Sequence, residues 1–214
     1  MNCRISHLFF SLISICFAQA VFAEFADIQQ IYRKTPYLHE FSFCQGGGCA
    51  KMSQLSLSQA DWQPIVELFE PPPQNAALER QYIAKAIGLL EQIVGNKTGT
   101  SNDRAGTFGN SDFSGQQDCN DEAINTTTYM RLLRQAGYMR FHEIEDMRTR
   151  NFFFNGWPHT TAVIHEIKTK ERYAVDSWFY DNGAPATIVP FKEWKDNFFP
   201  SDSSIIQPKK MPKR

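Results

Sequence analysis

The sequence has no internal repeat, no excess of basic charge and no long apolar run, and these absences narrow the class of protein. Its 22 Lys and Arg residues are balanced by 23 Asp and Glu residues, whereas a nucleic-acid-binding domain is usually strongly basic. The apolar run at residues 8–17 is far shorter than the ~20 residues that a transmembrane helix needs, and no later run is longer. We therefore expect neither a nucleic-acid partner nor an integral membrane protein.

The composition is that of a globular domain. Of 214 residues, 42% are hydrophobic and 21% are charged, which excludes a disordered chain, a collagen and a coiled coil. A chain of this length can build a hydrophobic core without help from many disulfides. We expect a single domain at residues 24–206, followed by a basic flexible tail at 207–214.

The first 23 residues have the pattern of a secretory signal peptide. Arg4 supplies the charged start, residues 8–17 form the apolar centre, and Val21-Phe22-Ala23 has the small-residue pattern of a cleavage site. We expect cleavage after Ala23 and a periplasmic or secreted protein.

Cysteine is scarce: the chain has five, and export would leave Cys44, Cys49 and Cys119. Because Gln45 and three glycines separate the first two, the chain can fold back there, and we predict a Cys44–Cys49 disulfide. The alternative, a zinc site, needs four ligands, and His39 is the only other ligand nearby. Cys119 is then an unpaired thiol in an oxidising compartment, either a small buried apolar side chain or a reactive group.

Periodicity and capping signals predict helices first and strands afterwards, which is an α+β order. Ser58 is a suitable N-cap for the first helix and Asp118 or Ser114 for the third, while Gly95 and Gly137 are suitable helix ends. A long loop rich in Gly, Ser, Asn and Thr precedes the third helix, and such loops are usually functional or disordered. The expected elements are helices at 58–69, 76–94 and 119–135, a loop at 95–117, and strands at 159–167 and 172–179.

Three residues have the chemistry of a nucleophile, its base and an orienting group. Cys119 opens a predicted helix, whose partial positive charge should favour the thiolate and lower the pKa of the thiol. His159 and Asp176 lie on the same face of a predicted hairpin and suit the other two roles. A two-residue turn at 169–170 would place Asp176 opposite Val163, about 13 Å from His159, so a bulge or a shifted loop is required to bring them together.

The segments that carry these residues resemble a known family. Residues 117–124 (QDCNDEAI), Pro158-His159 and residues 175–178 (VDSW) are similar to the Cys, His and Asp segments of the transglutaminase-like fold in the papain-like superfamily, and in particular to the bacterial transglutaminase-like cysteine proteinases. The resemblance covers roughly residues 115–180. It implies a helix bearing the cysteine, packed on an antiparallel sheet bearing the His and Asp. It also implies an exported cysteine peptidase or amidase with a peptide or protein substrate in the cell envelope.

The sequence departs from that family next to the cysteine. The acidic residue that directly follows the family's cysteine is implicated there in calcium binding, and this position is Asn120 here. Asp118 and Asp121 are still present, but one carboxylate fewer weakens a calcium site, so we expect no cofactor and no metal. The side-chain amides of Gln117 and Gln116 are candidate oxyanion donors, together with the backbone N–H of Cys119.

Two alternatives keep the same fold. One is a non-catalytic module that binds envelope proteins or peptidoglycan peptides through the same cleft. The other is an acyl transferase with the same triad, which the sequence does not distinguish from a hydrolase.

Overall fold

The computed structural model describes residue 31 and residues 34–108, 114–150 and 158–205. The expected signal peptide at 1–23 and the expected tail at 207–214 lie outside these residues. The chain divides into two compact units, residues 1–35 and 36–214, and every element named below belongs to the second unit. Among the described residues, no helix is both long and apolar enough to span a bilayer.

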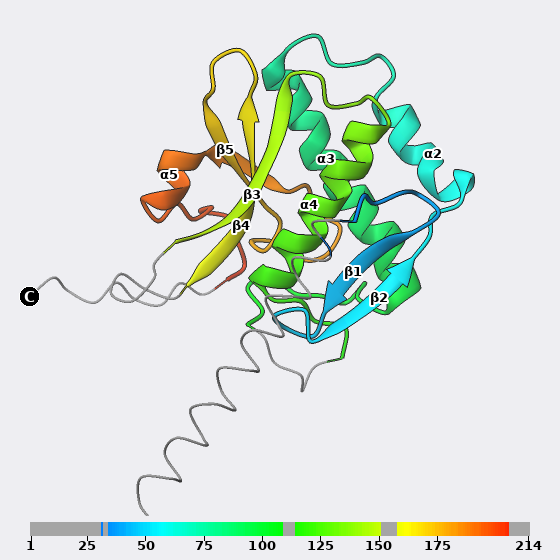
Figure 1. The fold of residues 1–214 in the computed structure, drawn as a ribbon. Helices are drawn as coiled ribbons and strands as arrows, with labels where there is room; N and C mark the ends of the chain where they lie inside the picture. The colour runs from blue at the N-terminus through cyan, green and yellow to red at the C-terminus, as the bar shows by residue number, and fades with distance from the viewer. Residues whose placement is uncertain (1–30, 32–33, 109–113, 151–157, 206–214) are drawn as a thin grey trace, which may run out of the picture. The chain divides into compact units, whose positions relative to one another are not determined.

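The second unit is α+β, as predicted (Figure 1). The predicted order of helices first and strands afterwards is wrong, because two strands, Phe41–Gln45 and Lys51–Leu55, precede the helices and a short helix, Phe191–Lys195, follows the last strand. One sheet is a two-stranded antiparallel ribbon, and the other has four antiparallel strands in the order β3-β4-β5-β6. The elements, in chain order, are β1 (Phe41–Gln45), β2 (Lys51–Leu55), α2 (Gln59–Leu68), α3 (Ala76–Thr98), α4 (Cys119–Gln135), β3 (His142–Arg150), β4 (His159–Glu166), β5 (Arg172–Asp176), β6 (Thr187–Pro190) and α5 (Phe191–Lys195).

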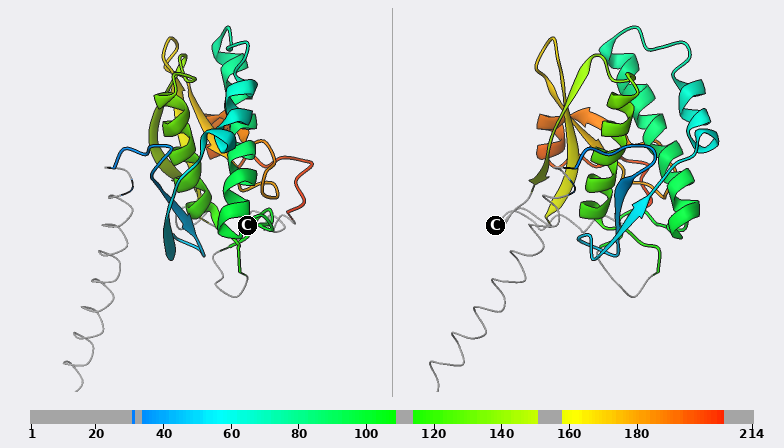
Figure 2. Two further views of the ribbon diagram at one scale, coloured as in Figure 1. Left: turned by 90° about the vertical axis from the view of Figure 1, so that its right-hand side faces the viewer. Right: turned by 45° about the vertical axis from the view of Figure 1, so that its right-hand side comes forward.

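Helix α4 is the central element of this unit. It contacts β1 on one side, β3, β4 and β5 of the larger sheet on another, and helix α3 (Figures 1 and 2). Most of its residues are therefore buried, including a run of three threonines that is unfavourable in an isolated helix. Two of these hydroxyls are satisfied within the helix, since Thr127 donates to the Ala123 carbonyl (2.7 Å) and Thr128 to the Ile124 carbonyl (3.0 Å).

The predicted end of α3 at Gly95 is wrong. The helix continues for another turn to Thr98 and ends at Gly99, which adopts a left-handed φ of 81°. Gly95 instead allows a close approach: a Cβ there would lie 3.0 Å from the Ser101 backbone nitrogen and 3.1 Å from the Asn182 amide nitrogen. In the sequence, a glycine that is needed for close packing therefore looks the same as a glycine that ends a helix.

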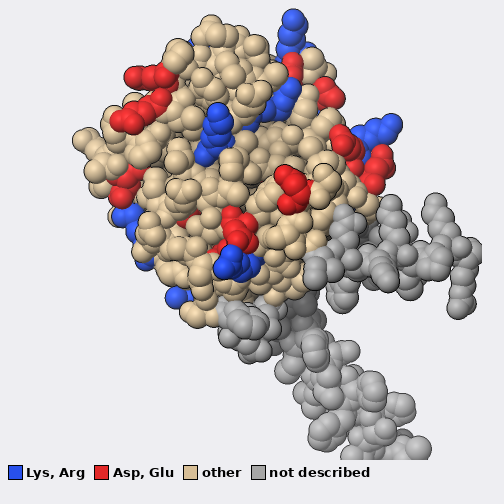
Figure 3. All heavy atoms as spheres, turned by 180° about the vertical axis from the view of Figure 1, so that it is seen from behind, with Lys and Arg blue, Asp and Glu red and all other residues tan. Residues whose placement is uncertain are grey.

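Helices α2 and α4 begin at the predicted caps. Ser58 and Asp61 form a capping box at the start of α2, and Asp118 and Asp121 form one at the start of α4, which rules out Ser114 as its cap. Charged side chains of both signs are scattered over the face shown in Figure 3, with no continuous basic area there.

Candidate functional site

Cys119 is the first residue of α4, and the preceding residue holds that helix end. One carboxylate oxygen of Asp118 accepts hydrogen bonds from the backbone N–H groups of Asn120 (3.0 Å) and Asp121 (2.9 Å). A side-chain cap satisfies donors that the first turn of a helix leaves unpaired. The cap at Asp118 therefore fixes the start of α4 directly before Cys119.

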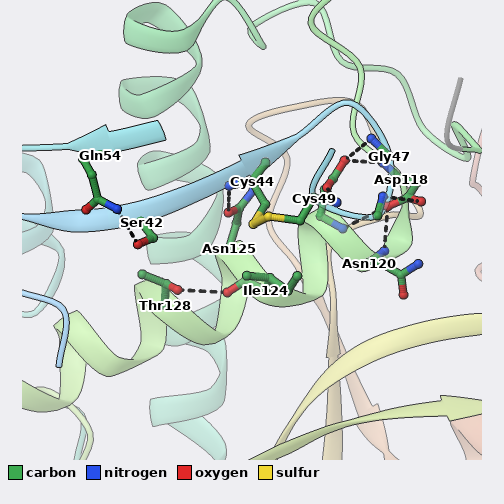
Figure 4. The surroundings of a disulfide bond; sticks show 12 residues. Ser42, Cys44, Gly47, Cys49, Gln54, Asp118, Asn120, Ile124, Asn125 and Thr128 are labelled. Carbon is green, nitrogen blue, oxygen red and sulfur yellow. Dashed lines mark hydrogen bonds between the residues drawn. A yellow bond between two sulfur atoms is a disulfide. The ribbon is translucent and has the colours of Figure 1, made fainter. Parts of the chain in front are cut away.

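A loop closed by a disulfide is attached to the same helix end (Figure 4). Cys44 and Cys49 form the expected bridge, with Cα atoms 4.6 Å apart. Within the loop, the N–H groups of Gly47 and Cys49 donate to the two carboxylate oxygens of Asp121 (2.6 Å each), and the N–H of Gly48 donates to Asp118 (3.0 Å).

The backbone conformation of this loop explains its three glycines. Residues 46–49 all have positive φ, with values of 90°, 87°, 59° and 62°. Successive residues of unusual conformation can point several N–H groups at one anion, and glycine adopts positive φ without strain. Here the anions are the two carboxylates of the α4 capping box. Asn125 adds a second attachment, since its amide exchanges two hydrogen bonds with the Cys44 backbone (2.9 and 2.8 Å).

His159 and Asp176 form a direct hydrogen bond. His159 Nε2 lies 2.7 Å from Asp176 Oδ2, and the exposed fractions of the two side chains are 6% and 2%. The pairing depends on strand register, because residues 167–171 join β4 to β5 in place of a two-residue turn, with His165 opposite Arg172. This shifts Asp176 to a position opposite Thr161, about 7 Å along the strand from His159, a diagonal separation that the two side chains bridge.

Cys119 lies in the same buried region as this pair. Its side chain clusters with Trp178 and Phe179, and the His159 ring packs on the same two aromatic rings, with centroid distances of 4.6 and 5.5 Å. The backbone N–H of Thr160, the residue after His159, favours the thiolate form of Cys119. The structure therefore brings His159 and Asp176 into direct contact and places Cys119 against the same two aromatic rings as His159.

The predicted strand at 172–179 ends early, at Asp176. Beyond it the chain leaves the sheet, which lets Trp178 and Phe179 pack against Cys119. The second nitrogen of the imidazole, His159 Nδ1, is buried and has no hydrogen-bond partner among the described residues.

The expected lowering of the Cys119 pKa is wrong. Burial raises the pKa of the thiol to about 12, with the negative charges of Asp118 and Asp176 acting in the same direction. The Thr160 N–H and the cysteine's own N–H favour the thiolate but do not outweigh these effects. In this structure the thiol is therefore neutral at neutral pH.

Of the two candidate oxyanion glutamines, Gln116 is already engaged. Its amide oxygen accepts from the Arg104 N–H (3.1 Å) and the Thr107 hydroxyl (3.1 Å), and its amide nitrogen donates to the Asn102 carbonyl (2.9 Å). Gln116 thus holds the preceding loop. Gln117, which is buried and is tied through its backbone N–H to Asp103 (3.0 Å), is left as the side-chain candidate.

The polar loop before α4 lies against the segment that follows Asp176. Gly106 donates its N–H to the Trp178 carbonyl (2.9 Å), the Trp178 indole donates to the Thr107 carbonyl (2.8 Å), and the Phe108 ring packs edge-on against Trp178 at 5.2 Å. The described part of the loop is therefore part of the site.

The carboxylates suggested for calcium serve another purpose. Asp118 and Asp121 accept backbone N–H groups of the disulfide loop and of α4, so a cation would have to displace these donors. Within residues 34–108, 114–150 and 158–205, no group of three or more His, Cys, Asp or Glu side chains is arranged to hold a metal.

Sequence reasoning missed three acidic residues near the site, of which Asp103 and Glu122 are buried and Glu91 is half-buried. Burial raises the pKa of Glu91 to about 8 and that of Asp103 to about 7, and it raises the pKa of Glu122 well above its usual range. Glu91 accepts a hydrogen bond from the Gly183 N–H (3.0 Å), and the Ser177 hydroxyl also acts to lower the pKa of Glu91 without offsetting the effect of burial. No sequence signal distinguishes these residues from solvent-exposed acids, because their protonation depends on which elements cover them.

No family model, curated protein or solved structure matches this chain. The function is therefore inferred from the residues of the site and their geometry.

Proposed function

We propose that this protein is an exported cysteine-dependent hydrolase, a peptidase or amidase with a transglutaminase-like fold, that acts on a peptide or protein of the cell envelope. Cys119 is the nucleophile, His159 the base and Asp176 the group that orients the base. The observation that carries the proposal is the 2.7 Å bond from His159 Nε2 to Asp176, which leaves the buried Nδ1 without a partner beside the cluster that contains Cys119. A base held on one nitrogen and free on the other is the arrangement that nucleophile activation needs.

The raised pKa of Cys119 determines the order of proton movements. A neutral thiol must lose its proton as the sulfur attacks the carbonyl carbon, and His159 Nδ1 accepts it while Asp176 stabilises the resulting imidazolium. The oxyanion forms near the Cys119 N–H and the Gln117 amide, the candidate donors. Collapse breaks the C–N bond, and the leaving amine takes the proton from His159. Water, deprotonated by the same imidazole, then hydrolyses the thioester and restores the thiol.

Alkylation by iodoacetamide tests the role of His159. With a pKa of about 12, only about one Cys119 thiol in 10⁵ is ionised at pH 7 without a base. A general base contributes roughly 10²- to 10⁴-fold, so we expect the wild type to alkylate at Cys119 at least ~100-fold faster than His159→Ala.

His165→Ala is the matched control for this experiment. It removes a partly buried histidine from the same strand, one that pairs with Glu143 and Glu145 instead of the site. Mass mapping without reductant keeps Cys44 and Cys49 blocked and follows the peptide that contains Cys119, the free cysteine among the described residues. Equal alkylation rates in the wild type and His159→Ala would overturn the proposal.

A second candidate is a non-catalytic binding module with the same fold. The observation that favours it is the state of Cys119, which is only 6% exposed and has a raised pKa, as expected for an inert buried cysteine. Thiol reactivity that does not depend on His159 would support this function. Acyl transfer to an amine uses the same triad and would appear as a substrate joined to an added amine.

Two further points support export. The Cys44–Cys49 disulfide is typical of an oxidising compartment. The N-terminal charge and apolar pattern is that of a signal peptide.

A further inference from the structure

The short helix α5 contributes a buried side chain to the His159–Asp176 pair. Trp194 has no exposed surface, and its indole Nε1–H donates to Asp176 Oδ2 at 2.7 Å. The same oxygen is bonded to His159 Nε2 at 2.7 Å, so one carboxylate oxygen accepts from both rings. The imidazole and indole rings are also neighbours, with centroids 5.7 Å apart.

Arg150 contacts both the ring and the backbone carbonyl of Trp194. Its guanidinium lies 4.7 Å from the centre of the Trp194 ring, and its Nη1 donates to the carbonyls of Trp194 and Phe198. Arg150 is the last residue of β3 and is paired in register with His159, the first residue of β4. The indole is therefore placed by the strand pair that also places the imidazole.

We propose that Trp194 is a positioning residue: its indole N–H fixes the Asp176 carboxylate so that this carboxylate holds the His159 imidazole with the proton on Nε2 and with Nδ1 free. The inference rests on the proposed function for its consequence in catalysis, but the positioning itself concerns only the three side chains.

The physical reason lies in the number of donors on one oxygen. A carboxylate attached through a rotatable bond and bonded to the imidazole alone can turn with it, whereas a second donor from a different element fixes the plane of the carboxylate. Without the indole N–H, Asp176 Oδ2 loses a charge-assisted bond and the Nε2–H···Oδ2 bond is no longer constrained. The proton can then occupy Nδ1, which leaves no acceptor for the Cys119 proton.

Histidine NMR tests the positioning directly, and Trp194→Phe is the variant, since it keeps an aromatic ring and removes the N–H. In the wild type, we expect ¹⁵N correlation spectra to show His159 protonated at Nε2, with a downfield, slowly exchanging proton. In Trp194→Phe this proton signal should move upfield or be lost to exchange, and both tautomers should appear. Alkylation of Cys119 by iodoacetamide should fall by about 10- to 100-fold, as expected for a misplaced catalytic group.

Trp62→Phe is the matched control, because Trp62 is a buried tryptophan of α2 that stacks on Tyr138 and belongs to the core instead of the site. It should lose comparable packing and keep both the His159 signal and the alkylation rate of the wild type. If Trp194→Phe does not fold, β-(3-benzothienyl)alanine at position 194 keeps the bicyclic shape and replaces the N–H by sulfur, and it should give the same loss of signal.

The two proposals fail separately. An unchanged His159 signal in a folded variant that lacks the indole N–H would overturn the role of Trp194 and leave the triad intact. A lost signal supports the positioning role of Trp194 whatever the alkylation result, because the NMR measurement requires neither substrate nor thiol. If His159→Ala leaves alkylation unchanged, the hydrolase proposal is overturned and the positioning role still stands.

Discussion

Replacing Asp121 by alanine should destabilise the protein far more than its place in a capping box suggests. The Asp121 carboxylate is fully buried and accepts three backbone N–H groups, from Gly47 (2.6 Å), Cys49 (2.6 Å) and Asp118 (3.3 Å). Two of these donors belong to the disulfide loop, more than 70 residues away in sequence. The substitution therefore removes the Asp121 half of the capping box and two of the bonds that attach the loop, while Asp118 still caps the helix.

The magnitude follows from the donors left unpaired. Each partly buried N–H that loses its acceptor costs about 1–3 kcal/mol, and the lower end applies where water can reach the loop. Burial raises the pKa of Asp121 to about 6, which means that its charged form is destabilised in the folded protein. Removing this charge at pH 7 therefore offsets part of the loss in stability. We expect Asp121→Ala to lower the free energy of unfolding by about 3 kcal/mol.

Asp61→Ala is the matched control, since Asp61 has the same position in the capping box of α2. Its carboxylate bonds only to Ser58 and Lys97 near the surface, and the loss of an ordinary cap costs about 1 kcal/mol. Urea unfolding of both variants with the disulfide intact, at one pH, gives the two values. Equal losses would refute the role assigned to Asp121 in holding the loop.

Two further predictions concern Glu91 and Gly88, both residues of helix α3. Glu91 has a pKa of about 8 in the folded protein, against its usual value of 4.5 in an unfolded chain, so between these pH values the folded state retains a proton that the unfolded state has lost. The free energy of unfolding should therefore fall as the pH rises from about 4.5 to 8, and Glu91→Gln should reduce this fall. Thermal melts at pH 5 and pH 8 measure it, and identical pH profiles for the two proteins would contradict it. Gly88→Ala places a Cβ 2.7 Å from the carbonyl oxygens of Gly183 and Ala184, so overpacking should cost about 1–3 kcal/mol and exceed the helix-propensity gain of about 1 kcal/mol. A urea midpoint higher than that of the wild type would refute this reasoning.

The features that could be predicted from the sequence depend on residues close together in the chain. The caps at Ser58 and Asp118 were predicted from one turn of sequence, and the Cys44–Cys49 pairing from a five-residue spacing rich in glycine. Gly95 shows the limit of such signals, because a glycine that ends a helix and a glycine that admits a neighbouring segment have the same local pattern.

The candidate site was predicted as three residues but not as a geometry. The sequence placed His159 and Asp176 on one face of a hairpin, and the length of the connection between β4 and β5, residues 167–171, decided that they are within reach of each other. Trp194 could not have been found, because a tryptophan in a short helix carries no signal that its N–H meets a carboxylate 18 residues away.

The sequence by itself determined the α+β class, the starts of the three predicted helices and the identity of the residues with the chemistry of a triad, because backbone preferences and caps act within one or two turns. It did not reveal β1, β2, β3, β6 or α5, because short strands depend on the partner strands that they pair with. The tertiary structure alone decided the attachment of the disulfide loop to Asp121 and the protonation of Cys119. A helix start favours the thiolate through local dipoles, whereas burial and the nearby Asp118 and Asp176 charges oppose it. Loss of solvent outweighs the local dipoles here, and no stretch of sequence records how deeply the fold will bury a side chain.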